Sequence, residues 1–170
     1  MSAGRGRFDE VDRIVAAWRR ERPDLDVSPL EVLSRVTRLA RHLDRARGAA
    51  FSAHGLDVWE FDVLAALRRA GEPYELSPGQ LTAETLVTSG TMTNRIDRLE
   101  QRALVRRRPD PSDGRGVLVG LTENGRELVD TALEDLLDRE RALLSSLGAA
   151  DAAALAASLR RLVAPFDDPR

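Results

Sequence analysis

One stretch in the middle of the chain constrains the fold most, because its hydrophobic period changes from that of helices to that of strands. Residues 78–84 and 89–103 have helical spacing, and helix-start signals open both runs, Ser77-Pro78 the first and Ser89 the second. Two short strand-like runs follow, Val105–Arg108 and Val117–Leu121, on either side of the turn-rich segment Pro109–Gly116. Short helix, turn, second helix and hairpin is the order of a winged helix-turn-helix, so the fold class is mainly α with a small β-hairpin wing.

Helices flank this segment on both sides. Apolar residues recur at helical spacing over 8–21, 28–50, 57–69 and 122–147, and again beyond Gly148. The predicted parts are an N-terminal extension helix (1–27), a linking helix (28–56), a DNA-binding lobe (57–121) and C-terminal helices (122–170). A small winged domain cannot cover the apolar stripes at both chain ends, which favours a dimer formed by the N- and C-terminal helices over a monomer with these helices folded back.

The composition limits the class of protein. The chain has 170 residues and no cysteine, so disulfides, zinc-thiolate sites and cysteine nucleophiles are excluded. No run of apolar residues is long enough for a membrane span, and the first residues do not resemble a signal peptide, so a cytoplasmic protein is expected.

Charge is distributed unevenly along the chain. The net charge is −2, and all 26 basic residues are arginine. Residues 89–115 hold seven arginines against four acids, a local net of +3, whereas from residue 122 onward acids outnumber arginines by ten to six. Genomic base composition accounts for the absence of lysine, but the local excess of arginine indicates a nucleic-acid surface.

The helix that starts at Ser89 has two distinct faces. Its predicted core stripe is Met92, Ile96, Leu99 and Ala103. Its opposite, polar face is Gly90, Asn94, Asp97, Arg98 and Gln101, flanked by Thr91 and Thr93. Small residues permit close approach to DNA, and Asn and Arg can read base edges in a major groove. A solvated surface helix would have a similar composition, and the hairpin directly behind it favours the DNA interpretation.

The hairpin supplies further arginines. Strand alternation places Arg106 and Arg108 on one face and Val105 and Arg107 on the other. Arginine beside a mobile tip suits phosphate contact and minor-groove insertion, although an exposed turn with incidental charge is the alternative. The predicted DNA-binding residues are Ser89, Gly90, Thr91, Thr93, Asn94, Arg98, Arg106, Arg108, Asp113 and Arg115.

The segments 87–100, 103–105 and 107–115 together resemble the recognition helix and wing of the MarR family. The Asp-x-Arg pair of that wing is Asp113 and Arg115 in this chain, and Leu121-Thr122 followed by Gly125 is similar to the family's junction between wing and helix. Gly116 departs from the hydroxyl residue that is common in the family. The resemblance implies a transcription regulator, often a repressor, that forms a triangular homodimer and binds a pseudo-palindromic site in double-stranded DNA.

The helix before Pro23 resembles the extension found in the PecS-like, urate-responsive subset of that family. The resemblance implies a small anionic aromatic ligand, such as urate or a phenolic acid, held by Trp18, Asp62 and Arg95, with Arg22 as a further candidate. Asp62 lies in an otherwise apolar helix and needs a partner, so an Arg95–Asp62 ion pair is expected, for which a planar anion could compete. The alternatives are a Trp18 that docks into the core, an Arg95 that contacts phosphate and an Asp62 with a structural pairing.

Other function classes have little support. The chain has two histidines, no Gly-rich phosphate loop and no paired metal-ligand spacing, so no catalytic residue, metal or cofactor is predicted. His42 and His54 are expected to be surface or cap residues. A metal site formed by His54 with carboxylates has no further sequence motif to support it. A ligand-independent helical module that binds another protein is the alternative to the DNA regulator, and an enzyme is a more distant one.

Overall fold

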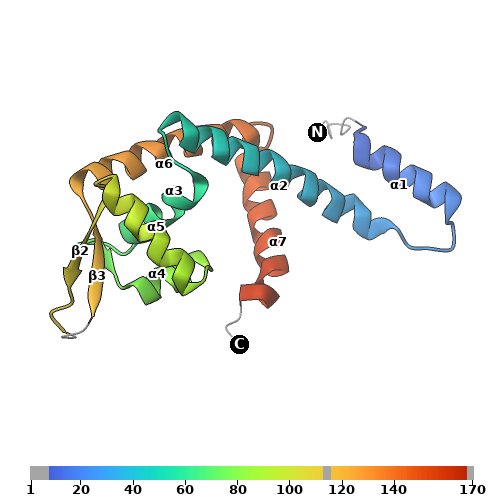
Figure 1. Cartoon of the computed structure of the whole chain (residues 1–170). Helices are drawn as coiled ribbons and strands as arrows, with labels where there is room; N and C mark the ends of the chain where they lie inside the picture. Colours follow the sequence, from blue (N-terminus) through green and yellow to red (C-terminus); the bar gives the residue numbers. More distant parts are fainter. Residues whose placement is uncertain (1–7, 113–115, 168–170) are drawn as a thin grey trace. The chain divides into compact units, whose positions relative to one another are not determined.

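The computed structural model describes residues 8–112 and 116–167. The chain divides into two compact units, Met1–Arg45 and Ala46–Arg170, with the boundary inside the long helix α2 (Ser28–Ala53) (Figure 1). Helices are present over each segment predicted to be helical, with ends that differ by a few residues from the sequence prediction.

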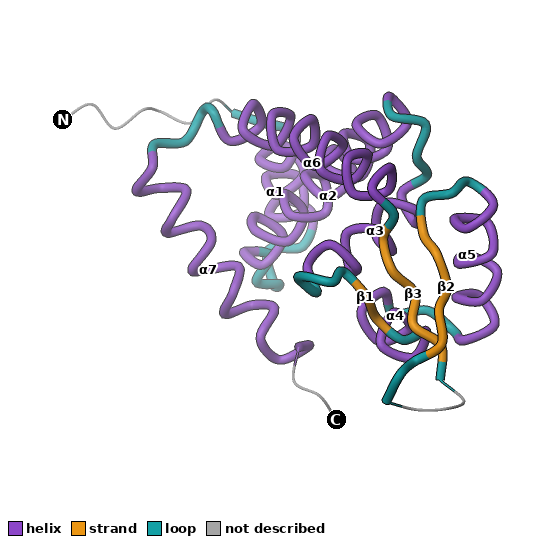
Figure 2. Tube along the Cα trace, turned by 90° about the vertical axis from the view of Figure 1, so that its left-hand side faces the viewer, coloured by secondary structure: helices purple, strands orange, loops and turns teal. Residues whose placement is uncertain are grey.

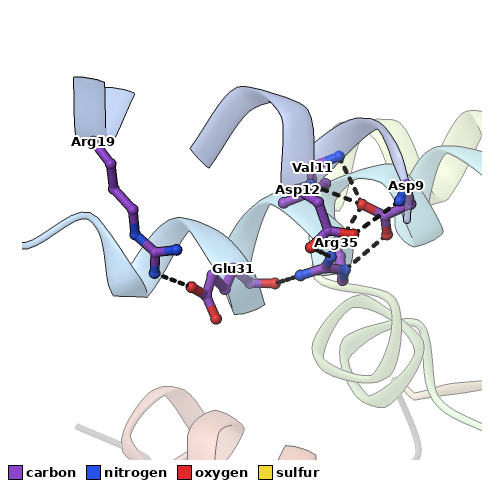
Figure 3. Close-up of polar contacts among 6 residues, drawn as sticks. All are labelled: Asp9, Val11, Asp12, Arg19, Glu31 and Arg35. Carbon is purple, nitrogen blue, oxygen red and sulfur yellow. Dashed lines mark hydrogen bonds and ion pairs between the residues drawn. The ribbon is translucent and has the colours of Figure 1, made fainter. Parts of the chain in front are cut away.

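The first unit joins α1 (Glu10–Glu21) to the N-terminal part of α2 through a network of ion pairs (Figure 3). Asp9 caps α1 by accepting from the backbone N–H groups of Val11 and Asp12 at 2.8 and 3.0 Å. Arg35 of α2 donates to Asp9 at 2.8 Å and to Asp12 at 2.7 Å, and Arg19 pairs with Glu31 one turn earlier in α2. The Arg35 guanidinium holds the pKa of Asp9 at about 2, so the Asp9 carboxylate stays charged at neutral pH.

A small apolar core lies beneath these ion pairs. Val11 and Val15 of α1 are buried against Val27, and Leu30 of α2 packs on them. The extension helix is therefore fastened to α2 by both packing and charge.

The second unit contains the winged lobe and the C-terminal helices. Its elements are α3 (Val58–Arg69), β1 (Glu75–Leu76), α4 (Pro78–Thr85), α5 (Ser89–Gln101), β2 (Val105–Pro109), β3 (Val117–Leu121), α6 (Glu123–Leu144) and α7 (Ala149–Asp167). The three strands form an antiparallel sheet in the order β1-β3-β2, with α5 beside β2 (Figure 2). The sequence predicted only the β2–β3 hairpin, because a strand of two residues is too short to show a period of two.

The core of this unit lies between α3, α4, α5, α6 and the sheet. Phe51 stacks on Phe61 with ring centroids 3.9 Å apart, and Leu64, Leu81 and Val119 are fully buried. Helix α3 is buried nearly all round, as its sequence predicted, and it also buries one charged residue, Glu60.

The C-terminal helices leave apolar side chains uncovered. The exposed set in α6, α7 and the segment between them is Leu133, Leu137, Leu143, Leu144, Leu147, Leu155, Leu162, Val163 and Phe166. Within the described residues no single helix has the length and apolarity to cross a bilayer, and α6 and α7 meet that criterion only together, across a bend of 105°.

Candidate nucleic-acid interface

The two helices of the predicted motif are joined by a tight turn. Ser77 caps α4 in a reciprocal pairing with Gln80, and Pro78 follows at the first helical position. The helix ends at Leu86, whose backbone is left-handed with φ 53° and whose side chain is 93% exposed. Thr88 then caps α5, which fixes where the second helix begins.

Helix α5 separates its buried side from its exposed side as predicted. Met92, Ile96 and Leu99 are at most 1% exposed. The exposed residues on its outer side include Ser89, Gly90, Thr91, Thr93, Asn94 and Arg98. One prediction for this helix was wrong, because Ala103 is exposed and lies beyond the helix end at Gln101, with φ 54°.

Asp97 has a side chain that is 47% exposed, but its carboxylate is paired with the wing, which the helical wheel did not show. Arg107 of β2 forms ion pairs with both Asp97 and Glu100 of α5, and Arg107 also donates its backbone N–H to Glu100 at 3.1 Å. The wheel gives an angle around the helix, but it does not show that β2 runs along this side. These contacts fasten the wing to α5.

The other face of β2 carries Arg106, which is exposed, and Arg108, which is half-buried. Arg108 Nε donates to Glu75 Oε1 at 2.8 Å, and the Glu75 side chain is only 6% exposed. Arg108 holds the pKa of the Glu75 carboxyl below its usual range. Gly120 lies between the two strands, and a Cβ there would be 2.8 Å from Glu75 Cγ, so glycine makes room for this pair.

The last two predicted DNA-binding residues, Asp113 and Arg115, lie outside the described residues. The described part of the interface therefore consists of the outer side of α5 and the base of the wing.

The predicted Arg95–Asp62 ion pair is wrong in this structure. Asp62 pairs instead with Arg47 of α2 at 3.0 Å, and its side chain is 41% exposed, so it does not need a partner from α5. Arg95 is half-buried and points toward the protein as expected, but its guanidinium lies over the ring of Trp59, 5.4 Å from the centroid.

The other two ligand candidates lie in the N-terminal unit. Trp18 is 48% exposed, so within that unit it is not a core residue. Arg22 forms two hydrogen bonds with Asp24, at 2.8 and 2.6 Å. Trp18 and Arg22 thus belong to one unit, whereas Asp62 and Arg95 belong to the other.

Comparison with known proteins identifies the family of this chain. The sequence profile of the MarR family matches residues 54–116. The HTH-type transcriptional regulator PecS of Dickeya dadantii is 41% identical over 156 residues, which cover 92% of this chain and 94% of PecS. The chain belongs to the MarR family.

Further comparisons agree with this membership. The HTH-type transcriptional repressor NicR of Pseudomonas putida is 32% identical over 143 residues, covering 82% of this chain and 89% of NicR. The crystal structure of wild-type MarR from E. coli superposes with a TM-score of 0.66 at 27% identity, over 78% of this chain and 96% of MarR. The protein is therefore a MarR-family transcriptional regulator with a winged-helix fold, and not an enzyme.

The sequence did not indicate three residues that organise this MarR-family lobe. Glu75 belongs to the short strand that was missed, and Trp59 was assigned to the general core of α3. Glu60 could have been found, because it lies three residues after Asp57 and accepts from that backbone N–H at 2.9 Å, as in a capping box. His54, expected at the surface or as a cap, has a side chain that is 22% exposed, with Nε2 3.6 Å from Asp135 Oδ2.

Proposed function

We propose that this chain binds specific sites in double-stranded DNA as a homodimer in the cytoplasm and represses transcription. A small anionic aromatic ligand, such as urate or a phenolic acid, lowers its affinity for DNA. The observation that carries the proposal is the outer side of α5, where polar and small residues are exposed while the apolar side is buried in the lobe.

Each side of the interface has a chemical role in this proposal. Asn94 and Arg98 read base edges in the major groove, and Ser89, Thr91 and Thr93 contact the backbone or bases beside them. Arg106 at the base of the wing and Arg115 at its tip contact phosphate or enter the minor groove, with Asp113 orienting Arg115. Arg108 is held by Glu75, so its contribution is mainly to keep the wing in shape.

The uncovered apolar side chains of α6 and α7 support the homodimer. Many exposed apolar side chains on neighbouring helices usually mark an interaction site, and a two-fold partner covers the same residues on both copies. Two recognition helices related in this way match a pseudo-palindromic duplex with half-sites about one helical turn apart.

Selection of bound duplexes from a random pool tests the DNA-binding proposal. We expect a defined pseudo-palindrome to emerge. Its affinity should fall about a thousandfold or more between 50 and 200 mM salt, as for proteins that contact several phosphates. Recovery of no preferred duplex, or an affinity that ignores salt, would point instead to a helical module that binds protein.

Gly90→Gln separates DNA contact from folding. Gly90 lies in the first turn of α5 and has no atom within 4 Å of an added Cβ, so a side chain there begins in open space. Replacing a helical glycine with a good helix former should raise stability by about 0.5–1 kcal/mol. Against the selected duplex we expect a loss of about 1–3 kcal/mol in binding, because the longer side chain prevents close approach.

Thermal unfolding and gel-shift titration measure the two effects in the same preparation. Gly48→Gln is the matched control, since Gly48 is also helical and open but lies in α2. Unchanged DNA affinity in Gly90→Gln would place the first turn of α5 away from the groove.

The ligand proposal rests on the similarity to PecS and on two arginines, Arg22 and Arg95. Among the described residues, the contact that holds the Arg95 guanidinium is the face of Trp59, so a planar anion can attract it without breaking a strong ion pair there. Titration with urate, xanthine and salicylate should release the selected duplex, and Arg95→Ala should abolish the release. If none of the three changes DNA affinity, or if Arg95→Ala responds like the wild type, this ligand site is wrong.

A further inference from the structure

Two arginines of α5 and the arginine that caps its C-terminal end face the beginning of α3. Arg95, Arg98 and Arg102 are spaced at i, i+3 and i+7, which places them along one side of the helix. All three contact residues around the start of α3. Asp57 precedes this helix, and Trp59 and Glu60 lie in its first turn.

Trp59 is the centre of this group. The guanidinium carbons of Arg98 and Arg95 lie 4.9 and 5.4 Å from the centroid of its ring. The indole Nε1 donates to Asp57 Oδ2 at 3.1 Å, which fixes the orientation of the ring. The same carboxylate oxygen lies 3.9 Å from Arg98 Nη2.

The three arginines are held with different strength. Arg102 donates to Glu60 at 2.7 Å and to the Gly55 carbonyl at 3.0 Å, and the Glu60 side chain is only 4% exposed. Arg98 has a side chain that is 62% exposed, with one long ion pair and the ring face as its contacts. Arg102 thus anchors the end of α5, whereas Arg98 is oriented on the surface and can still move to a new partner.

We infer that Trp59 is a positioning residue for DNA recognition, acting through Arg98 and, to a lesser extent, Arg95. A free arginine side chain loses much rotamer entropy when it binds a base, and one already ordered against an indole face loses less. The ring attracts the guanidinium but does not satisfy its N–H donors, so these remain available to DNA. This inference rests on the proposed function.

The test compares Trp59→Leu and Trp59→Phe on the wild-type-selected duplex and on a scrambled duplex of equal length. We expect Trp59→Leu to weaken binding to the selected duplex about fivefold, the size of one or two cation–π contacts. Binding to the scrambled duplex should change less than twofold, because non-specific affinity depends on charge, which this substitution leaves unchanged. Trp59→Phe keeps an aromatic face and should restore part of the loss.

Two controls separate positioning from general stability. Tyr74→Leu removes a different cation–π contact of the lobe, that of Arg68 with the Tyr74 ring at 4.9 Å, and should leave the ratio of the two affinities unchanged. In an Arg98→Ala background, Trp59→Leu should cost less than twofold, since residues that act as a unit are not additive.

The outcomes distinguish this inference from the proposed function. Equal weakening on both duplexes, or full additivity with Arg98→Ala, would show a merely structural role for Trp59 and overturn the inference. A wild-type protein that selects no duplex at all would overturn the proposed function itself.

Discussion

Gly125→Ala is expected to destabilise the protein by about 3 kcal/mol, at the upper end of what overpacking costs. A Cβ at this position would lie 2.0 Å from the carbonyl oxygen of Leu104, a backbone atom that cannot rotate away. That carbonyl also accepts from the backbone N–H of Thr122 at 3.1 Å, and the Thr122 hydroxyl accepts from Gly125 N–H at 3.0 Å. One added methyl group therefore pushes apart the junction of wing, recognition helix and α6.

Urea unfolding at a fixed protein concentration measures the effect, because the stability of a dimer depends on concentration. Gly148→Ala is the matched control, since an added Cβ there meets no atom within 4 Å and the backbone needs no positive φ. A Gly125→Ala variant as stable as Gly148→Ala would mean that Leu104 and α6 are farther apart in solution than in this structure.

The sequence predicted the helices and the hairpin of the lobe well because each of these has a strong local signal. Helical period identified Met92, Ile96 and Leu99 as the buried side of α5, and all three are buried. Strand alternation separated Val105 and Arg107 from Arg106 and Arg108, and the contacts of Arg107 with α5 and of Arg108 with Glu75 agree. Local period decides which side of an element is apolar, whatever the element packs against.

The partners of charged residues could not be predicted in the same way. The helical wheel showed that Arg95 leaves α5 sideways, but the choice between Asp62 and Trp59 depends on how α3 crosses α5. Asp62 pairs with Arg47 because Phe51 of α2 stacks on Phe61 of α3, which brings these two parts of the chain together. Such pairings depend on tertiary packing, which a single sequence encodes only indirectly.

A second kind of failure came from short elements. The strand β1 has only two residues, yet it places Glu75 where its carboxylate reaches over Gly120 of β3 to pair with Arg108 of β2. Neither β1 nor the need for glycine at residue 120 shows in the local sequence, because both depend on the pairing of β1 with β3. The base of the wing is therefore more constrained than a free hairpin would be.

The double substitution Leu155→Glu with Leu162→Glu is expected to convert the proposed dimer to a monomer. It should also weaken binding to the selected duplex about a hundredfold or more. The two residues are seven apart in α7, on one side of the helix, and are 39% and 50% exposed. In the proposed homodimer this side is covered by the partner, and two buried carboxylates per chain would be too costly to keep there. A monomer binds a single half-site, so the gain of about 10²–10⁴ from joining two binding units is lost.

Sedimentation velocity reports the oligomeric state, and gel shift on the selected duplex and on one half-site reports the binding. The control Ala157→Glu with Ala164→Glu adds the same charge to the opposite, exposed side of α7, and should remain a dimer with nearly wild-type affinity. Affinity for the isolated half-site should be similar in both variants and the wild type, because each lobe keeps its own α5 and wing. If the Leu155 and Leu162 double variant stays dimeric and binds the full site as tightly as the control, α7 does not form the interface, and the two recognition helices must be paired by another surface.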